Sequence, residues 1–377
     1  KGYLRIWKQE GKYGGGGGLK AQEVLRGSEG GCGAINEKVC VGARASDAAM
    51  VMHATFGLDH YPNYLQRWQM SDIEELEMKL RAQLDKVVEE KEKLRQKLLS
   101  SSSFLCRLAT APAPQDIWDK RFLELIDGDG KLRLGKLNKI LSEEADGVYS
   151  FPLLQPSLCQ QIVSCANDFA AFTRQEKLEG KFDSERPAVL DMMKLGWIND
   201  MLLRQVVSPL AEALFEDELE GETLDWRHGY IVGYAPKDVI DQQDGGEGDK
   251  QRQPGQAGTE FRPRRNHLVS HTDDSEITLN VCLQSDYQGG ELVFHGRRGS
   301  GEELKTLGSF KAPAPGWAVL HVGRQLHEVL PVTGGKRYGL ILWTRSMRGM
   351  RSGVCPCCWL NRRHPTSAAC VCGPQWN

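Results

Sequence analysis

The stretch His271-Thr272-Asp273-Asp274-Ser275-Glu276-Ile277-Thr278-Leu279-Asn280-Val281-Cys282-Leu283 joins a His-x-Asp tripeptide to a run typical of a buried strand. If the strand continues through the tripeptide, His271 and Asp273 point to the same face of the sheet. His327 follows 54 residues after Asp273, and Arg337 follows ten residues after His327. Two imidazoles and one carboxylate can occupy one face of an octahedral Fe(II) and leave three positions open. The spacing therefore predicts a metal site formed by His271, Asp273 and His327.

Arg337 adds an anion site to this prediction. Its planar guanidinium is suited to bidentate capture of the far end of a dicarboxylate. Arg337 opens the last apolar strand, in which it alternates with Tyr338 and shares a face with Gly339, Ile341 and Trp343. We expect the guanidinium to point inward with that set. Each of these features alone is a weak signal for a metal site, because a His-x-Asp tripeptide occurs often by chance. The combination of the tripeptide with His327 and Arg337 favours an iron site.

Two residues compete with the predicted ligands. Asp274 adjoins Asp273, but a shift of one residue turns its side chain to the opposite face of the strand. We therefore expect it to be solvated or to accept a hydrogen bond outside the metal site. His321 competes with His327, yet only His327 has the ten-residue spacing to an arginine. We expect His321 to hydrogen bond near the metal rather than bind it.

The rest of the chain predicts an α+β domain, with helices first and short strands afterwards. Gln155-Pro156-Ser157 opens a helix with an apolar face, and a second helix is expected over 194–215. The strands expected after them lie at 227–235, 266–271, 276–283, 290–296, 316–321, 325–330 and 337–345. A barrel or sandwich would bring His327 across to the His-x-Asp strand, because strands distant in sequence line one interior.

Four regions are expected along the chain. Residues 1–70 are glycine-rich and read as poorly ordered, and residues 71–145 form a helical region. The domain that carries the predicted metal site covers 146–348, with a disordered insertion at 236–266, and a cysteine-rich tail covers 349–377. The stretch Asp127-Gly128-Asp129-Gly130 begins like a calcium loop, but the later positions do not fit, so we expect a plain acidic turn.

A long amphipathic helix is expected over 72–99, opened by the capping box Ser71-Asp72-Ile73-Glu74. Its apolar positions recur at spacings of three, four or seven residues. Self-association as a coiled coil is one interpretation, but Glu77 and Lys91 fall on the seam. A helix that packs on its own domain or stays solvated is the favoured one.

Composition excludes few functions. The net charge is −2, from 48 basic and 50 acidic residues, so no basic footprint of a nucleic-acid binder is evident. Five of the eleven cysteines lie in the last 23 residues, which does not fit a secreted disulfide scaffold. No apolar run reaches the ~18 residues of a membrane span. A reducing cytoplasmic or nuclear location is favoured, although the chain begins with Lys1 and its N-terminus is expected to be incomplete.

Residues 146–358 resemble the 2-oxoglutarate and iron-dependent oxygenase domain-containing proteins of plants and animals, a prolyl 4-hydroxylase-like branch of the Fe(II) oxygenases. The matching segments are Gly147-Val148-Tyr149, Leu154-Gln155-Pro156, the stretch 271–283, Gly289-Gly290-Glu291-Leu292, Leu320-His321, Leu326-His327, Arg337 and Cys355-Pro356-x-Cys358. The resemblance covers a little over half of the chain. The insertion at 236–266 departs from the shorter link of the family.

The resemblance implies a double-stranded β-helix, or jelly-roll, core in which His271, Asp273 and His327 hold Fe(II). It also implies that 2-oxoglutarate chelates the metal while Arg337 pairs with its 5-carboxylate. Dioxygen then oxidises 2-oxoglutarate to succinate and CO2 as a C–H bond of a primary substrate is hydroxylated, and ascorbate acts as reductant. Tyr234 and Thr278 either donate hydroxyls to 2-oxoglutarate or are ordinary strand residues. A prolyl or lysyl side chain of a protein is the family-level expectation for the substrate.

Two alternatives stay open. The tail cysteines Cys355, Cys358, Cys370 and Cys372 could hold a structural zinc, but a flexible tail with reduced thiols is favoured. The chain as a whole could be a non-catalytic jelly-roll scaffold with a vestigial metal site. The intact ligand set and Arg337 argue for a 2-oxoglutarate-dependent dioxygenase instead.

Overall fold

The centre of the fold is a layer of three long antiparallel strands, β4 (Trp226–Tyr234), β6 (Ile277–Gln284) and β13 (Arg337–Arg345). They belong to a computed structural model that describes residues 108–175, 188–244, 261–298 and 300–350, with six more between 89 and 100. The described residues from 108 to 350 form one compact unit. β6 is buried almost throughout, because the opposite sheet covers one of its faces and a helix covers the other.

Four further strands extend this layer to seven, in the order β1-β2-β10-β6-β13-β4-β3. They are β1 (Ser142–Ala145), β2 (Val148–Pro152), β3 (Ala188–Val189) and β10 (Trp317–Val322). A second, four-stranded sheet has the order β5-β11-β8-β9. Its strands are β5 (Leu268–His271), β8 (Leu292–Arg297), β9 (Thr306–Phe310) and β11 (Gln325–Val329). A short pair, β7 (Tyr287–Gly289) and β12 (Val332–Gly335), lies apart from both.

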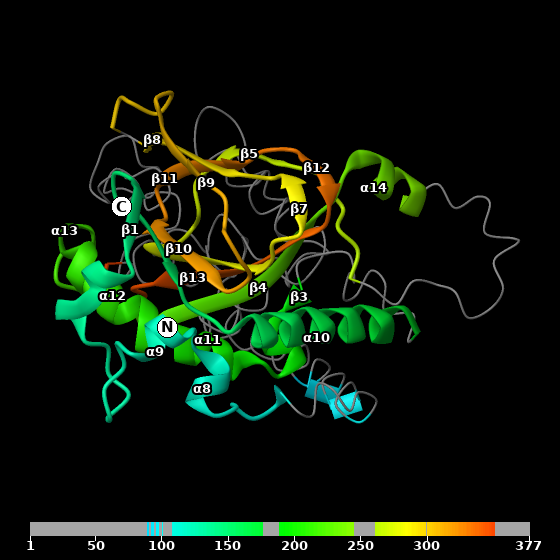
Figure 1. The fold of residues 1–377 in the computed structure, drawn as a ribbon, viewed down its shortest axis with the longest axis horizontal. Coiled ribbons are helices and arrows are strands. Elements are labelled where there is room, and N and C mark those ends of the chain that lie inside the picture. The colour runs from blue at the N-terminus through cyan, green and yellow to red at the C-terminus, as the bar shows by residue number, and fades with distance from the viewer. Residues whose placement is uncertain are drawn as a thin grey trace, which may run out of the picture. The chain divides into compact units, whose positions relative to one another are not determined.

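Strands of the two sheets alternate along the chain, which identifies the architecture. The chain passes from β4 in the large sheet to β5 in the small one and back to β6 in the large one. It then enters the small sheet again for β8 and β9, crosses to β10 in the large sheet, to β11 in the small sheet and finally to β13 in the large sheet. Four strands of each sheet thus face each other as a double-stranded β-helix, the jelly-roll arrangement. Figure 1 shows β5, β8, β9 and β11 above β4, β10 and β13. The predicted α+β class with a jelly-roll core is confirmed.

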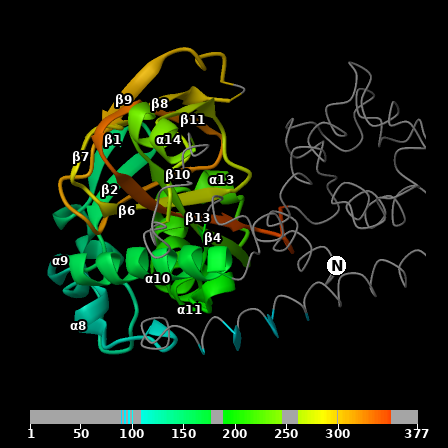
Figure 2. The same ribbon diagram turned by 90° about the vertical axis from the view of Figure 1, so that its right-hand side faces the viewer.

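Helices cover the outer face of the large sheet. The main ones are α10 (Pro156–Gln175) and a continuous helical run made of α11 (Gly196–Leu202), the π-helical turn η4 (Leu203–Val207) and α12 (Ser208–Leu214). α10 packs on β6 and α11 on β4, on the side away from the small sheet (Figure 2). Shorter elements are α8 (Pro114–Ile117), α9 (Lys120–Leu123), η2 (Leu134–Lys139), η3 (Leu190–Met193), α13 (Glu216–Leu219) and α14 (Lys237–Asp244). The first predicted helix begins where it was expected, and the second is confirmed within two residues of both ends.

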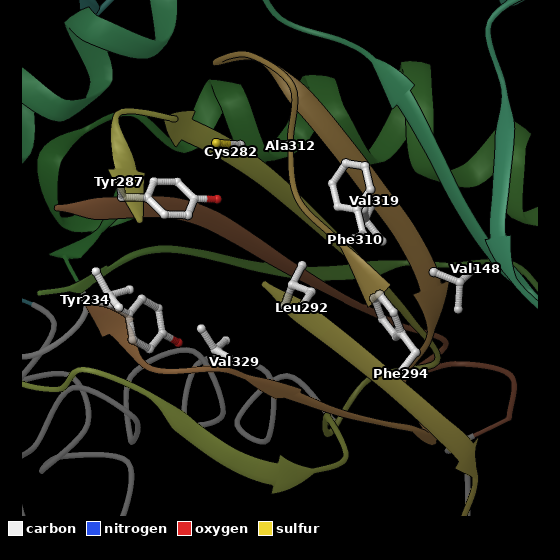
Figure 3. Close-up of a cluster of buried hydrophobic side chains, with 11 residues drawn as sticks. Val148, Tyr234, Cys282, Tyr287, Leu292, Phe294, Phe310, Ala312, Val319 and Val329 are labelled. Atoms are coloured by element: carbon white, nitrogen blue, oxygen red, sulfur yellow. The ribbon is translucent and has the colours of Figure 1, made fainter. Parts of the chain in front are cut away.

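The space between the two sheets is filled by side chains from both. Phe294, Leu292 and Val329 of the small sheet meet Val319 and Tyr234 of the large one in a single buried cluster (Figure 3). Burying such side chains contributes about 1.5–3 kcal/mol each. This cluster fills part of the barrel and leaves the ends of β5 and β11 beside its open part.

Two predicted boundaries are wrong. The domain was expected to begin at residue 146, but β1 starts at Ser142, and Phe122 of α9 stacks on Phe151 with ring centroids 6.0 Å apart. Residues 108–145 therefore pack into the same unit. The insertion 236–266 was expected to be disordered throughout. Its beginning forms α14, and at its end Phe261 is buried and donates its backbone N–H to Asn167 Oδ1 at 2.7 Å.

Other predictions fall partly or wholly outside the described residues. These include the region 1–70, most of the helix 72–99 and the cysteine tail from 351 onward. The acidic stretch does form a turn, in which Asp127 Oδ1 accepts the backbone N–H groups of Asp129 and Lys131. None of the helices in the described part of the chain has the length and apolar character needed to span a bilayer.

Candidate metal centre

The three predicted ligands come together at one end of the β5–β11 pair. His271 is the last residue of β5 and lies directly opposite His327 of β11 in the strand register. Asp273 follows in the turn after β5. Its Oδ1 lies 3.6 Å from His271 Nε2, and its Oδ2 lies 3.8 Å from His327 Nε2. One donor atom from each residue lies within 4.8 Å of the other two, a spacing that suits a single metal ion.

Both histidines are held in the tautomer that a metal needs. His271 Nδ1 donates to the carbonyl of Val269 at 2.9 Å, and His327 Nδ1 donates to the carbonyl of Gln325 at the same distance. Because each Nδ1 carries the proton, each Nε2 presents a lone pair toward Asp273. Burial, reinforced by His327, lowers the pKa of His271 and keeps its imidazole neutral. The donor set of two neutral imidazoles and a carboxylate fits Fe(II).

Asp273 is fixed by hydrogen bonds rather than by strand pleating. β5 ends at His271, where the predicted range 266–271 also ends, so the strand does not continue through Asp273. Instead, the Asp273 backbone N–H donates to Gly323 O at 2.8 Å, and the Thr278 hydroxyl donates to Asp273 Oδ2 at 2.7 Å. Burial would raise the pKa of Asp273, but the nearby histidines and the Thr278 hydroxyl outweigh it and lower that pKa. The carboxylate is therefore ionised and ready to bind a cation.

The three predicted ligands differ in exposure. The side chain of His271 is 30 % exposed, whereas those of Asp273 and His327 are 4 % and 7 % exposed. His271, on the edge strand of the small sheet, is therefore the ligand most accessible to solvent.

The competing residues lie where they cannot complete the triad. Asp274 Oδ2 accepts a hydrogen bond from Arg345 at 2.7 Å. His321 is buried with its ring 4.7 Å from that of His327 and 5.5 Å from Phe294, and its Nδ1 donates to Val322 O. The group of residues able to hold a metal in the described part of the chain is His271, Asp273 and His327.

The buried His321 makes the fold sensitive to acid. Burial, with a contribution from His327, lowers its pKa from 6.5 to about 4. A histidine with a lowered folded-state pKa binds its proton more readily when unfolded, so stability is lost as pH falls from 6.5 toward 4. This predicts a loss of about 2 kcal/mol between pH 7 and pH 5. Urea unfolding of the metal-free protein should show that extra loss relative to His321→Gln, which keeps a donor but does not titrate. Equal losses in both proteins would contradict the assignment.

Arg337, the first residue of β13, is buried in the same barrel, and its guanidinium is only partly paired, through hydrogen bonds with Tyr234 and Tyr287. It is 5 % exposed, and its Nη1 is buried without a hydrogen-bond partner among the described residues. Its guanidinium carbon lies 5.2 Å from the ring centre of Tyr234 and 6.0 Å from that of Tyr287. A buried, incompletely paired guanidinium is costly unless an anion completes it. The geometry therefore fits a carboxylate ligand beside Tyr234, one of the two alternatives left open for that residue, whereas the Thr278 hydroxyl is directed to Asp273.

An aromatic wall lies on the inward face of β4 and β13. We give this name to His228, Tyr230 and Trp343, of which only Trp343 was expected on that face; His228 lies opposite Trp343 in the strand register, and Tyr230 lies diagonally across from it. The rings of Tyr230 and Trp343 meet edge to face with centroids 5.4 Å apart, and His228 lies 5.3 Å from Tyr230. The signal for it was present: His228 and Tyr230 precede Tyr234 at even spacings and share its face.

Comparisons with known proteins find similarity to iron-dependent oxygenases. Residues 111–220 match the family model described as the OGFOD2-like domain. The chain is 34 % identical over 221 residues to the 2-oxoglutarate and iron-dependent oxygenase domain-containing protein CP2 of Arabidopsis thaliana, covering 55 % of this chain and 48 % of that protein. Over 307 residues it is 24 % identical to the human 2-oxoglutarate and iron-dependent oxygenase domain-containing protein 2, covering 74 % and 75 %. The chain is related to these oxygenases. The predicted resemblance is thereby confirmed.

These relatives differ from the chain in extent. The chain spans about half the length of the first two Arabidopsis relatives, 48 % and 53 %. Among solved structures, AviO1 of Streptomyces viridochromogenes aligns over 54 % of this chain and 90 % of its own, with 15 % identity and a TM-score of 0.36. A Pseudomonas putida prolyl-4-hydroxylase aligns over 56 % and 90 %, with 16 % identity and a TM-score of 0.29.

Proposed function

We propose that this protein is an Fe(II)- and 2-oxoglutarate-dependent dioxygenase that hydroxylates a C–H bond of a primary substrate. The observation that carries the proposal is the pairing of two incomplete sites in one barrel. Three convergent metal donors lie at one end of β5 and β11, and a buried Arg337 with an unpartnered Nη1 lies deeper on β13. A scaffold protein would have no need to keep either arrangement at a cost in stability.

The chain's own residues divide the work of binding. His271, Asp273 and His327 would hold Fe(II) and leave three positions free for other ligands. Arg337 would pair with the 5-carboxylate of 2-oxoglutarate, and the phenol of Tyr234 lies close enough to assist it. When bound, iron with 2-oxoglutarate and O2 supplies the oxidising chemistry, which releases succinate and CO2. The sheets and the buried core exclude water from the remaining sides of the site.

The primary substrate would approach along the aromatic wall. Tyr230, Ile341 and Trp343 are inward-facing yet only half-buried, and Tyr230 lies within electrostatic reach of Asp273, so the wall offers an apolar surface on the side of the metal site. A prolyl or lysyl side chain of a protein fits such a surface, through ring stacking or through its aliphatic stem. Among the relatives is the human multifunctional procollagen lysine hydroxylase and glycosyltransferase LH3, 27 % identical over 214 residues and covered over 24 % of its length. That name supports a protein substrate.

The proposal is tested by turnover of 2-oxoglutarate. Purified protein supplied with Fe(II), O2 and ascorbate should form succinate, and His271→Ala should abolish it together with iron binding. His295→Ala is the matched control, because His295 lies on the neighbouring strand β8 and pairs with Glu328 at 3.0 Å, outside the metal group. It should turn over 2-oxoglutarate as the wild type does. A wild-type protein that neither binds iron nor forms succinate would exclude the enzyme and leave the scaffold interpretation.

Several narrower assignments remain predictions. Ascorbate is proposed as the reductant, and a cytoplasmic or nuclear location is proposed from composition. Structural zinc in the cysteine tail and self-association through the helix 72–99 involve residues that are largely outside the described part of the chain.

A further inference from the structure

The turn that carries Asp273 is tied to a buried cation that takes no part in metal binding. Arg345, the last residue of β13, donates from Nε to the backbone carbonyl of Asp274 at 2.6 Å and from Nη2 to Asp274 Oδ2 at 2.7 Å. Its guanidinium carbon lies 4.1 Å from the ring centre of Trp226, the first residue of β4. One guanidinium thus holds both the main chain and the side chain of the residue that follows a metal ligand.

The burial of this pair is asymmetric. The Arg345 side chain is 1 % exposed, whereas that of Asp274 is 34 % exposed. A buried guanidinium strongly disfavours losing its partner, because its charge would remain in a low-dielectric surrounding. Asp274 is therefore drawn to Arg345 rather than to solvent. The same contact occupies the carboxylate that lies nearest in sequence to Asp273, and so keeps it from competing for the metal.

The residues before and after Arg345 in the sequence, Thr344 and Ser346, hydrogen bond with Glu276 at the other end of the same turn. Glu276 donates its backbone N–H to Thr344 O at 3.0 Å, and Glu276 Oε2 accepts the backbone N–H of Ser346 at 3.0 Å. Three consecutive residues at and just after the end of β13, Thr344, Arg345 and Ser346, thus hydrogen bond with residues 274 and 276. The contact between Glu276 and Thr344 directly adjoins the last register pair of β13 with β6, Thr344 with Ile277, whereas the contacts of Arg345 with Asp274 lie beyond that pairing. These hydrogen bonds fix the turn after β5 and therefore the position of Asp273.

We propose that Arg345 and Asp274 form a brace that sets the metal affinity of the site by fixing the turn that carries Asp273. Both are positioning residues, since neither lies in the group of metal donors. The inference rests on the metal site of the proposed function. Loss of the brace leaves all three donors present but lets the Asp273 carboxylate move relative to the two imidazoles. Loss of an interaction that orients a ligand in this way weakens metal binding about 10- to 100-fold.

The test is a titration of the whole metal-free chain with Co(II) alone. Binding is monitored by visible absorbance under anaerobic conditions. Asp274→Ala should raise the Kd for Co(II) about tenfold. Asp274→Asn, which keeps the backbone contact and an oxygen acceptor for Arg345, should raise it less than Asp274→Ala. Asp274 is partly exposed, so both variants should fold. Arg345→Lys provides the reciprocal change, because a point charge cannot make the two-point contact.

Arg227→Lys is the matched control. Arg227 lies on β4 and, like Arg345, is largely buried; it donates to Asp191 at 2.7 Å and to Asp200 at 3.0 Å, facing the helices rather than the metal site. It should lower the Tm but leave the Kd for Co(II) unchanged. The brace is overturned if the Asp274 variants bind Co(II) as tightly as the wild type, or if Arg227→Lys weakens binding equally. A wild type that does not bind Co(II) overturns the proposed function as well, which separates the two failures.

Discussion

Asp273→Asn is expected to lower the affinity for Fe(II) by more than ~100-fold and to reduce succinate formation to background. The change keeps the size of the side chain and its contact with Thr278 but removes the only negative charge among the three donors. Loss of a hydrogen bond to a ligand already costs about 10- to 100-fold in metal affinity, so loss of the anionic ligand itself should cost more. Metal content after anaerobic loading and gel filtration, with succinate measured in parallel, checks both effects.

Asp286→Asn is the control for this change. Asp286 is exposed between β6 and β7 and lies outside the metal group, so its iron content and turnover should match the wild type. Iron retention by Asp273→Asn at the wild-type level would show that the metal is held elsewhere, and it would remove the basis for assigning His271 and His327 as ligands.

The sequence predicted the strands that carry the site because those strands are buried. β4, β6, β10, β11 and β13 begin and end within one or two residues of the predicted ranges, since covered strands are rich in apolar residues. β9 and β12 were missed because they are short, largely exposed and contain glycine. Edge strands of this kind carry no alternating pattern, and only pairing with a neighbour in the folded chain defines them.

The ligand set could be predicted, but the way it is held could not. The ten-residue step from His327 to Arg337 favoured His327 over His321, and the structure brings His327, not His321, into the group with His271 and Asp273. The preference for Asp273 over Asp274 rested on strand alternation, which does not apply because β5 ends at His271. The two carboxylates differ through their partners, Thr278 for Asp273 and Arg345 for Asp274, and Arg345 is 71 residues away from Asp274 in the chain. Contacts over such separations leave no periodic signal in a single sequence.

Arg337→Met should have opposite effects on binding and on stability. A bidentate, charge-assisted contact with a carboxylate is worth about 3 kcal/mol, so its loss should raise the KM for 2-oxoglutarate about 100-fold. In the metal-free protein, however, Arg337 Nη1 is buried without a partner among the described residues, and the guanidinium is 5 % exposed. Replacing it with an apolar side chain of similar length removes a desolvated charge, so the Tm of the metal-free protein should stay the same or rise.

A raised KM together with an unchanged or raised Tm distinguishes an anion-binding arginine from a structural one. A structural arginine such as Arg227, which is already paired with Asp191 and Asp200, should lose stability on replacement and leave the KM unchanged. Arg337→Lys keeps the charge but not the planar fork, so its KM should lie between those of the wild type and Arg337→Met. Steady-state kinetics at saturating Fe(II), combined with thermal unfolding of the metal-free proteins, measures both quantities. An Arg337→Met protein that is much less stable, with an unchanged KM, would mean that Arg337 supports the barrel rather than the co-substrate.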